Sequence, residues 1–130
     1  MKRRWLLGLL SAPFSSLGQP KRKKQSGLLA EVRELKAGRA GGRITIDGVV
    51  RNAGTRPLAK LVLFFELLDA DRKMISRRRG GVDEAVLEPG DESAFHFYLA
   101  DQARAVEVAV AAEQRGMETE VAKPGPYPIE

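Results

Sequence analysis

Apolar and polar positions alternate along most of the chain after residue 28, and the densest apolar run is Leu58–Asp69, LAKLVLFFELLD. Alternation at every second residue is the pattern of a β-strand with one buried face. Leu and Glu also favour helices, but a helix would be apolar on all sides between Leu61 and Phe65. The run therefore predicts a strand with Lys60 and Glu66 on one face, and the other face is wholly apolar: Ala59, Leu61, Leu63, Phe65 and Leu67.

The same alternation predicts further strands around this one. They cover Arg43–Asn52, Met74–Arg77, Asp83–Leu87, Glu92–Leu99, Ala103–Gln114 and Met117–Ala122. Leu28–Lys36 fits either an edge strand or a short helix, and the all-β context favours the strand. The predicted core combines the apolar faces of these segments: Phe65, Leu67, Phe95, Phe97, Val106 and Val108.

Glycine, proline, asparagine and aspartate mark the connections between these segments. Glu88–Asp91, EPGD, has the proline and glycine of a type II turn. Asp69–Lys73 has two nearby carboxylates, which suggest either calcium or an Asx turn. Calcium needs six to eight oxygen ligands, so the Asx turn is favoured. Gly48 interrupts an otherwise regular strand and predicts a bulge or a close approach of a neighbouring strand.

About seven short strands separated by turn signals predict an all-β fold, an antiparallel β-sandwich. The sandwich domain is expected to span residues 28–122, followed by a proline-rich, extended tail at 123–130. With no cysteine in the chain, no inter-sheet disulfide can form, and stability must come from the two apolar inner faces.

The N-terminus has the organisation of a secretory signal peptide over residues 1–18. Basic residues at positions 2–4 precede an apolar stretch, and Ser16 and Gly18 are the small residues expected before a cleavage site. The apolar stretch is too short and too polar to span a bilayer, which takes about 20 residues. Export to the periplasm or the extracellular space is predicted. Basic residues directly after the cut slow export, so an uncleaved or differently cut leader is the alternative.

The linker at residues 19–27 contains a basic cluster, Lys21, Arg22, Lys23 and Lys24. It predicts either a solvated spacer or a peripheral contact with an anionic membrane. Residues 1–29 hold seven basic and no acidic residues, so the remainder has 15 basic against 17 acidic residues. The high isoelectric point therefore comes from the leader and the linker, and nucleic-acid binding is not predicted.

Few catalytic chemistries are open to this composition. Cysteine is absent, and His96 is the single histidine. Thiolate sites and two-histidine metal sites are thereby excluded, and no cofactor is predicted. His96 falls on the outer face of its strand, where a surface histidine is a better interpretation than a catalytic one.

The strongest charge feature after the linker is Arg77-Arg78-Arg79, followed by two glycines. Arginine forks bind carboxylates and phosphates, so these three residues are the candidate contact with an anionic partner. The favoured interpretation is structural, since charged residues on an edge strand prevent pairing with other chains.

Three elements of the sequence, Gly48–Gly54, Phe65–Asp69 and Leu87–Phe95, resemble those of a known family, the FxLYD domain family. Gly48-Val49-Val50-Arg51-Asn52-Ala53-Gly54 is similar to its G-x-V-x-N-x-G element. Phe65–Asp69 resembles its F-x-L-Y-D signature, with Leu68 in place of the tyrosine, and Leu87–Phe95 is similar to its L-x-P-G-x…F element. The resemblance implies an immunoglobulin-like domain of exported prokaryotic proteins, without catalytic residues.

Together these features predict a non-enzymatic, exported module that contacts an envelope or extracellular protein. The alternative is a carrier that binds a small organic or anionic ligand in a pocket between the two sheets.

Overall fold

The structure, a computed structural model, describes residues 27–130. The predicted signal peptide and the basic cluster at residues 21–24 lie outside the described residues. Within residues 27–130 every regular element is a strand, so the all-β class is confirmed. The described residues include no helix that is long and apolar enough to cross a membrane.

Ten strands follow one another along residues 27–130. They are β3 (Leu29–Ala40), β4 (Arg43–Asn52), β5 (Leu58–Ala59), β6 (Leu61–Leu68), β7 (Met74–Gly81), β8 (Val86–Leu87), β9 (Glu92–Ala100), β10 (Glu107–Gln114), β11 (Met117–Ala122) and β12 (Tyr127–Pro128). The segment at residues 28–36, for which helix and strand were both open, is therefore a strand. It lies inside the sheet between β4 and β11 and not at an edge.

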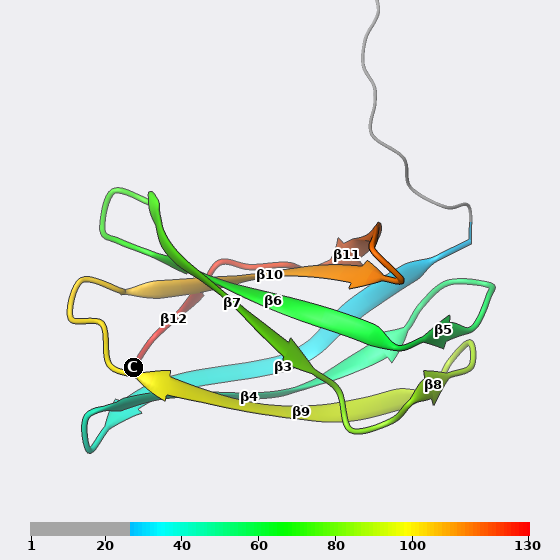
Figure 1. Ribbon diagram of the computed structural model, residues 1–130, viewed down its shortest axis with the longest axis horizontal. Coiled ribbons are helices and arrows are strands. Elements are labelled where there is room, and N and C mark those ends of the chain that lie inside the picture. The colour runs from blue at the N-terminus through cyan, green and yellow to red at the C-terminus, as the bar shows by residue number, and fades with distance from the viewer. Residues whose placement is uncertain (1–26) are drawn as a thin grey trace, which may run out of the picture.

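Eight strands form one large sheet that is nearly closed into a barrel. Its order is β7-β6-β10-β11-β3-β4-β9, and β12 pairs with β10 off this path. The ribbon shows β6 and β10 in one layer and β3, β4 and β9 in a second layer below it (Figure 1). The short strands β5 and β8 pair with each other at one end. The two ends of the large sheet are β7 and β9.

The sheet is mixed, so the prediction of a wholly antiparallel arrangement is wrong. β11 pairs with β10 antiparallel up to Thr119 and then pairs with β3 in parallel from Glu120 to Ala122. Because β11 leaves one layer and continues along the other, it joins the two layers through backbone hydrogen bonds. The strand periodicity in the sequence does not specify which strands become neighbours.

The proline-rich tail takes part in the sheet. Tyr127 and Pro128 pair with Val108 and Glu107 at the start of β10, which β11 leaves unpaired. The next two residues continue toward β3, where the Glu130 amide donates to Ala37 O at 2.9 Å. The tail thus fills the position beside β10 that β11 vacates when it crosses to β3.

The long apolar run is divided at Lys60, which has a φ of 55°. Leu61, Leu63, Phe65 and Leu67 are all buried, as the alternation predicts. Unbroken alternation would place Leu58 on the opposite face, with Lys60, but Leu58 is also buried at 1% exposure. The left-handed residue reverses the alternation, so that Leu58 in β5 and Leu61 in β6 both point inward.

The close approach predicted at Gly48 is present. A β-carbon at this position would collide with Glu34 O and with the ring of Phe95. The colliding oxygen belongs to Glu34, which lies beside a bulge in β3 between Val32 and Glu34. Gly48 is therefore required by packing across strands.

The core contains four of the six predicted residues in fully buried positions: Phe65, Leu67, Phe95 and Val108. Phe97 is partly buried and packs against the cluster. The prediction for Val106 is wrong, because this side chain is 39% exposed. It precedes β10 in a loop, and the turn at residues 103–104 places Ala105 inward instead.

The predicted turns have the expected hydrogen bonds. The Asp91 amide donates to Glu88 O at 2.9 Å and Gly90 has a φ of 91°, which together define the type II turn. Asp69 Oδ1 accepts hydrogen bonds from the amides of Asp71 and Lys73 at 2.9 and 3.0 Å. These two hydrogen bonds form the predicted Asx turn. They engage the Asp69 carboxylate, which would have been a ligand in the calcium alternative.

Candidate functional site

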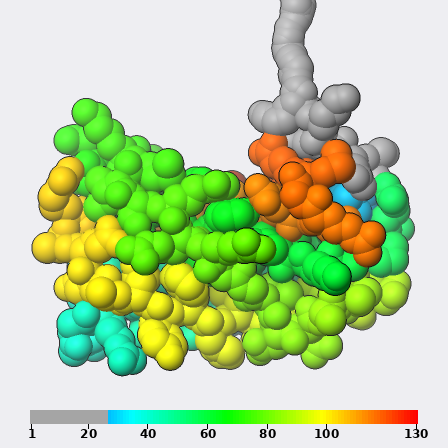
Figure 2. Space-filling model, viewed as in Figure 1, coloured from blue at the N-terminus to red at the C-terminus, as the bar shows by residue number. Residues whose placement is uncertain are grey.

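The arginine run lies on β7, at one end of the large sheet. Arg77, Arg78 and Arg79 are all exposed. β7 pairs with β6 on one side only, and the space-filling view shows the β7 atoms on the visible surface beside those of β9 (Figure 2). The placement on an exposed edge strand follows directly from this sheet order.

The three arginines alternate between the two faces of the sheet. Arg78 lies opposite Phe65, whose ring is buried. The side chain of Arg78 therefore belongs to the inner face of the sheet and reaches solvent at the edge of β7. Arg77 and Arg79 lie opposite Glu66 and Phe64 on the outer face. The edge of β7 therefore presents positive charge on both of its faces.

Only one of these arginines is neutralised within residues 27–130. Arg77 Nε lies 3.3 Å from Glu66 Oε2, and its guanidinium lies 4.0 Å from the centre of the Phe64 ring. Arg78 Nε donates to Ser76 Oγ at 3.1 Å, which leaves its charge uncompensated. Arg79 forms no ion pair with any of the described residues. Two guanidinium groups are thus available to an anion at this edge.

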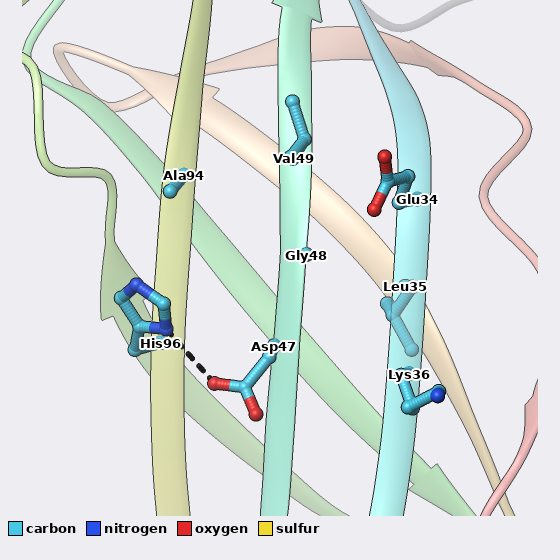
Figure 3. Close-up of a pocket in the computed structure, with 8 residues that line it drawn as sticks. All are labelled: Glu34, Leu35, Lys36, Asp47, Gly48, Val49, Ala94 and His96. Atoms are coloured by element: carbon cyan, nitrogen blue, oxygen red, sulfur yellow. Dashed lines mark hydrogen bonds and ion pairs between the residues drawn. The ribbon is translucent and has the colours of Figure 1, made fainter.

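A second surface lies on the outer face of β3, β4 and β9. Here a hollow of about 580 Å³ extends over Gly48 and is bordered by small or apolar residues and by charged ones (Figure 3). The strand register places Lys36, Asp47 and His96 in one row across the three strands, and Glu34, Val49 and Ala94 in the next. The bulge in β3 and the small side chains at the centre make this face concave.

His96 binds Asp47 on this surface. The distance between His96 Nδ1 and Asp47 Oδ1 is 2.9 Å, and Nε2 lies 4.0 Å from Asp83 Oδ2. Because a carboxylate only accepts, Nδ1 carries the proton in this contact. The hydrogen bond with Asp47 raises the pKa of His96 above its ordinary value; the charges of Asp47 and Asp83 add to the increase, and desolvation opposes it.

The arrangement predicts a pH-dependent contribution to stability. A histidine with a raised pKa in the folded state stabilises the fold below its unfolded pKa, which is about 6.5, and this contribution disappears as the pH rises through the folded pKa. We expect the melting temperature of the wild-type protein to exceed that of His96→Gln at about pH 5 and the difference to vanish by about pH 9. Thermal unfolding of both proteins across this range measures it.

Asp47→Asn serves as the matched variant, since it removes the partner and keeps the histidine. Its difference from the wild type should have the same pH dependence. A difference between wild type and His96→Gln that stays constant, or that grows as the pH rises, would contradict the assignment.

A third polar cluster surrounds Asp69 at the β6–β7 turn. Arg104 Nη2 lies 3.4 Å from Asp69 Oδ2. The hydrogen bond from the Lys73 amide lowers the pKa of Asp69, with further lowering by the Asp71 amide and Arg104 and an opposing effect of burial. Asp69 thus stabilises the turn above its ordinary pKa, and the effect is lost as the pH falls through the lowered value. No group of three or more histidine or acidic side chains within residues 27–130 is arranged to hold a metal ion.

The arginine run was recognisable in the sequence, whereas the His96–Asp47 contact was not. Asp47 and His96 are 49 positions apart, and nothing local joins them. Both alternate with the apolar positions of their predicted strands, so the sequence predicts that both side chains point away from the core. The register of β4 against β9 then brings them opposite each other.

Comparisons with known proteins give structural similarities only. The sequence matches no family model and no curated protein. Among solved structures, a calcium-binding mutant of Bacteroides uniformis beta-glucuronidase 2 is 16% identical with a TM-score of 0.46, over 72% of this chain and 12% of that chain. IrmA from Escherichia coli is 10% identical with a TM-score of 0.47, over 82% of this chain and 99% of that chain. Pseudomonas fluorescens alkylpurine DNA glycosylase AlkC is 14% identical with a TM-score of 0.40, over 72% of this chain and 30% of that chain.

These similarities are too distant to assign a function. The sequence identities are low and each TM-score lies below 0.5. The chain also spans only about an eighth of the length of the beta-glucuronidase. The function is therefore inferred from the surfaces of this chain.

Proposed function

We propose that the protein is a non-enzymatic, exported module that binds another protein of the cell envelope or the extracellular space through its outer surface. The observation that carries the proposal is the exposed edge strand β7, on which Arg78 and Arg79 have no acidic partner among the described residues. Unneutralised arginines at the margin of a sheet are suited to charge-assisted contacts with a carboxylate or phosphate.

The packing of the interior supports a surface function. The space between the layers is filled by side chains, and the rings of Phe95 and Phe97 lie 5.7 and 5.0 Å from that of Phe65. A carrier with its ligand between the sheets would have to displace this cluster. The hollow over Gly48 is the alternative position for a small ligand, because Lys36 and His96 border it on the outer face.

The proposal includes an immunoglobulin-like sandwich related to the FxLYD family. Its support is the order of the three sequence elements described above, together with the two strand layers and the length of about 100 residues. Such domains contact their partners through sheet edges and loops. The resemblance to the family implies no catalytic residues.

Photo-cross-linking in the envelope of the native host tests the binding function. A photoreactive residue is placed at Arg79 on β7, at Lys36 on the outer face of β3, or at Arg115 in the β10–β11 turn. We expect one discrete protein adduct from the position that faces the partner, and none from the other two. The absence of an adduct from all three positions would overturn the proposal, and hydrolysis of ester or glycoside substrates by the purified protein would show an enzyme instead.

The export part of the proposal predicts a mature protein that begins near Gln19. The expectation follows from the basic, apolar and small-residue order of the first 18 residues. Mass spectrometry of the intact protein from periplasmic and cytoplasmic fractions of the native host measures the N-terminus. An intact Met1 on soluble cytoplasmic protein would refute export, and an intact Met1 in the envelope would identify an uncleaved leader.

A further inference from the structure

We propose that β7 accepts an extended, acidic segment of a partner protein as an added strand. The inference rests on the proposed binding function and specifies its mode and the class of its partner. Pairing of this kind uses the backbone hydrogen bonds of a sheet edge for affinity and the side chains for selectivity.

The first support is the unpaired backbone of β7. The strand forms a ladder with β6 from Met74 to Gly81. In an antiparallel pair, part of the backbone N–H and C=O groups point away from the neighbouring strand. Within residues 27–130 no backbone hydrogen bond outside the β6 ladder involves Ile75–Gly81. These groups form a row that another extended chain can use.

The second support is the contrast with the opposite end of the sheet. The edge of β9 is covered at its start by the segment that follows β7, because the Asp83 amide donates to Ala94 O at 3.1 Å and the Glu84 amide donates to Ser93 Oγ at 3.0 Å. No backbone group of the described residues covers β7 in this way, although Gln102 Nε2 donates to Ser76 Oγ at 3.3 Å near the start of the strand.

The third support is the charge, which selects the occupant. A second copy of β7 would place arginines against arginines and is disfavoured, since like charges directly opposite each other destabilise a strand pair. An acidic strand would instead form charge-assisted contacts with Arg78 and Arg79. The charges that keep the edge from pairing with its own copies thus leave it open to a partner of opposite charge.

The alternation along β7 also defines the sequence of the partner. Arg78 emerges from the inner face, and Arg77 and Arg79 from the outer face. Successive side chains of an added strand alternate in the same way. Three consecutive acidic residues would therefore lie opposite the three arginines, of which Arg78 and Arg79 are available for ion pairs and Arg77 is already paired with Glu66. The expected ligand is an extended segment with such an acidic triplet between β-favouring residues.

The probe is a labelled ten-residue peptide with a central Glu-Glu-Glu flanked by threonine and valine. Fluorescence anisotropy measures its binding to the full chain, and a peptide with Gln in place of the three glutamates is the control. Because the basic cluster of the linker attracts the same peptide, Lys21, Arg22, Lys23 and Lys24 are changed to Gln in every protein compared.

We expect saturable binding of the acidic peptide and loss of about tenfold in affinity for Arg78→Ser/Arg79→Ser, since each exposed charge pair contributes modestly. The matched control is Arg33→Ser/Arg43→Ser, which removes two exposed charges from β3 and β4. It should bind within about twofold of its parent. Thermal unfolding of both double variants checks that each is folded.

N-methylation of the peptide backbone separates strand pairing from simple attraction. Two peptides carry N-methyl groups on the odd or on the even residues. Only alternate amides of an added strand bind the sheet, so one of these peptides should lose binding and the other should retain it. Equal binding by both, or no saturable binding of the parent peptide, would overturn strand addition.

The two proposals can fail separately. If the peptide does not bind but cross-linking in the envelope yields a discrete adduct at Lys36 or Arg115, the binding function stands and the strand-addition mode is wrong. If neither experiment gives a signal, both are wrong.

Discussion

Phe65→Ala is expected to lower the free energy of unfolding by roughly 3–5 kcal/mol, the usual cost of truncating a buried phenylalanine. Phe65 is 0% exposed, and its ring contacts those of Phe95 and Phe97 from the opposite layer. Its ring also lies against Gly80, where a β-carbon would stand 2.9 Å from Phe65 Cε2. Removal of the ring leaves a cavity at the point where the two layers meet. A typical domain has only roughly 5–15 kcal/mol of stability, so a large share is lost.

Phe64→Ala is the matched control, because it removes the same ring one position earlier in the same strand. Phe64 lies on the outer face, where Arg77 covers it. Cation–π contacts at exposed sites contribute about 0.5–1 kcal/mol, so we expect a loss of about 1 kcal/mol. Denaturant midpoints of both variants compare the two faces of β6. Equal losses of stability would mean that both faces of β6 are buried, contrary to the assignment of Phe64 to the outer face.

Asn52→Ala is expected to lower the free energy of unfolding by about 3 kcal/mol, because it leaves several buried polar groups without partners. Asn52 is 0% exposed. Its Nδ2 donates to Arg56 O and to Leu87 O, both at 2.8 Å, and its Oδ1 accepts from the Gly54 amide at 2.9 Å. One side chain thus holds the turn after β4 and ties it to β8.

The backbone of Asn52 adds to this connection. Its amide donates to Asp91 O at 2.9 Å, and its carbonyl accepts from the Gly90 amide at 2.8 Å. The turn after β8 is therefore fixed to the same residue. Because the alanine variant keeps these backbone bonds, the predicted loss isolates the side-chain amide.

Two variants test the role of the Asn52 amide group. Asn52→Asp keeps the acceptor for Gly54 but places negative charge against two carbonyl oxygens, so its loss at neutral pH should equal or exceed that of alanine. Gln102→Ala removes a surface amide with one hydrogen bond of 3.3 Å to Ser76 and should change stability by less than about 0.5 kcal/mol. Chemical denaturation of the three proteins gives the comparison. A loss for Asn52→Ala no larger than that for Gln102→Ala would mean that the amide does not connect these turns.

The sequence predicted which side chains of most strands point inward, because successive side chains of a strand point to opposite faces and apolar residues recur at every second position. In β4 the buried residues Ile44, Ile46 and Val50 share one face of the alternating pattern. The turns were predictable for a similar reason, since Gly90 and Asp69 act on backbone groups a few residues away. Val106 fails because it lies outside the strand, in a loop where the alternation has no meaning.

For the candidate binding edge, the sequence predicted the exposed arginine side chains but not the strand pairing around them. Arg77, Arg78 and Arg79 are a feature of the sequence, and burial of three adjacent guanidinium groups is too costly to occur, so their exposure follows. The sequence does not specify that the strand has one neighbour, or that Arg77 is neutralised by Glu66 whereas Arg79 is not. These facts depend on the pairing of β7 with β6.

Local chemistry in the sequence thus determined the all-β class, the turns, the inward face of β6 and the presence of an exposed arginine strand. The tertiary structure decided the sheet order, the parallel pairing of β11 with β3, the incorporation of the tail as β12 and the reversal of facing at Lys60. It also decided the contact between His96 and Asp47. The physical reason is the range of the interactions: alternation and turn hydrogen bonds act over a few residues, whereas strand pairing joins segments tens of residues apart, whose partners are fixed only when the whole core packs.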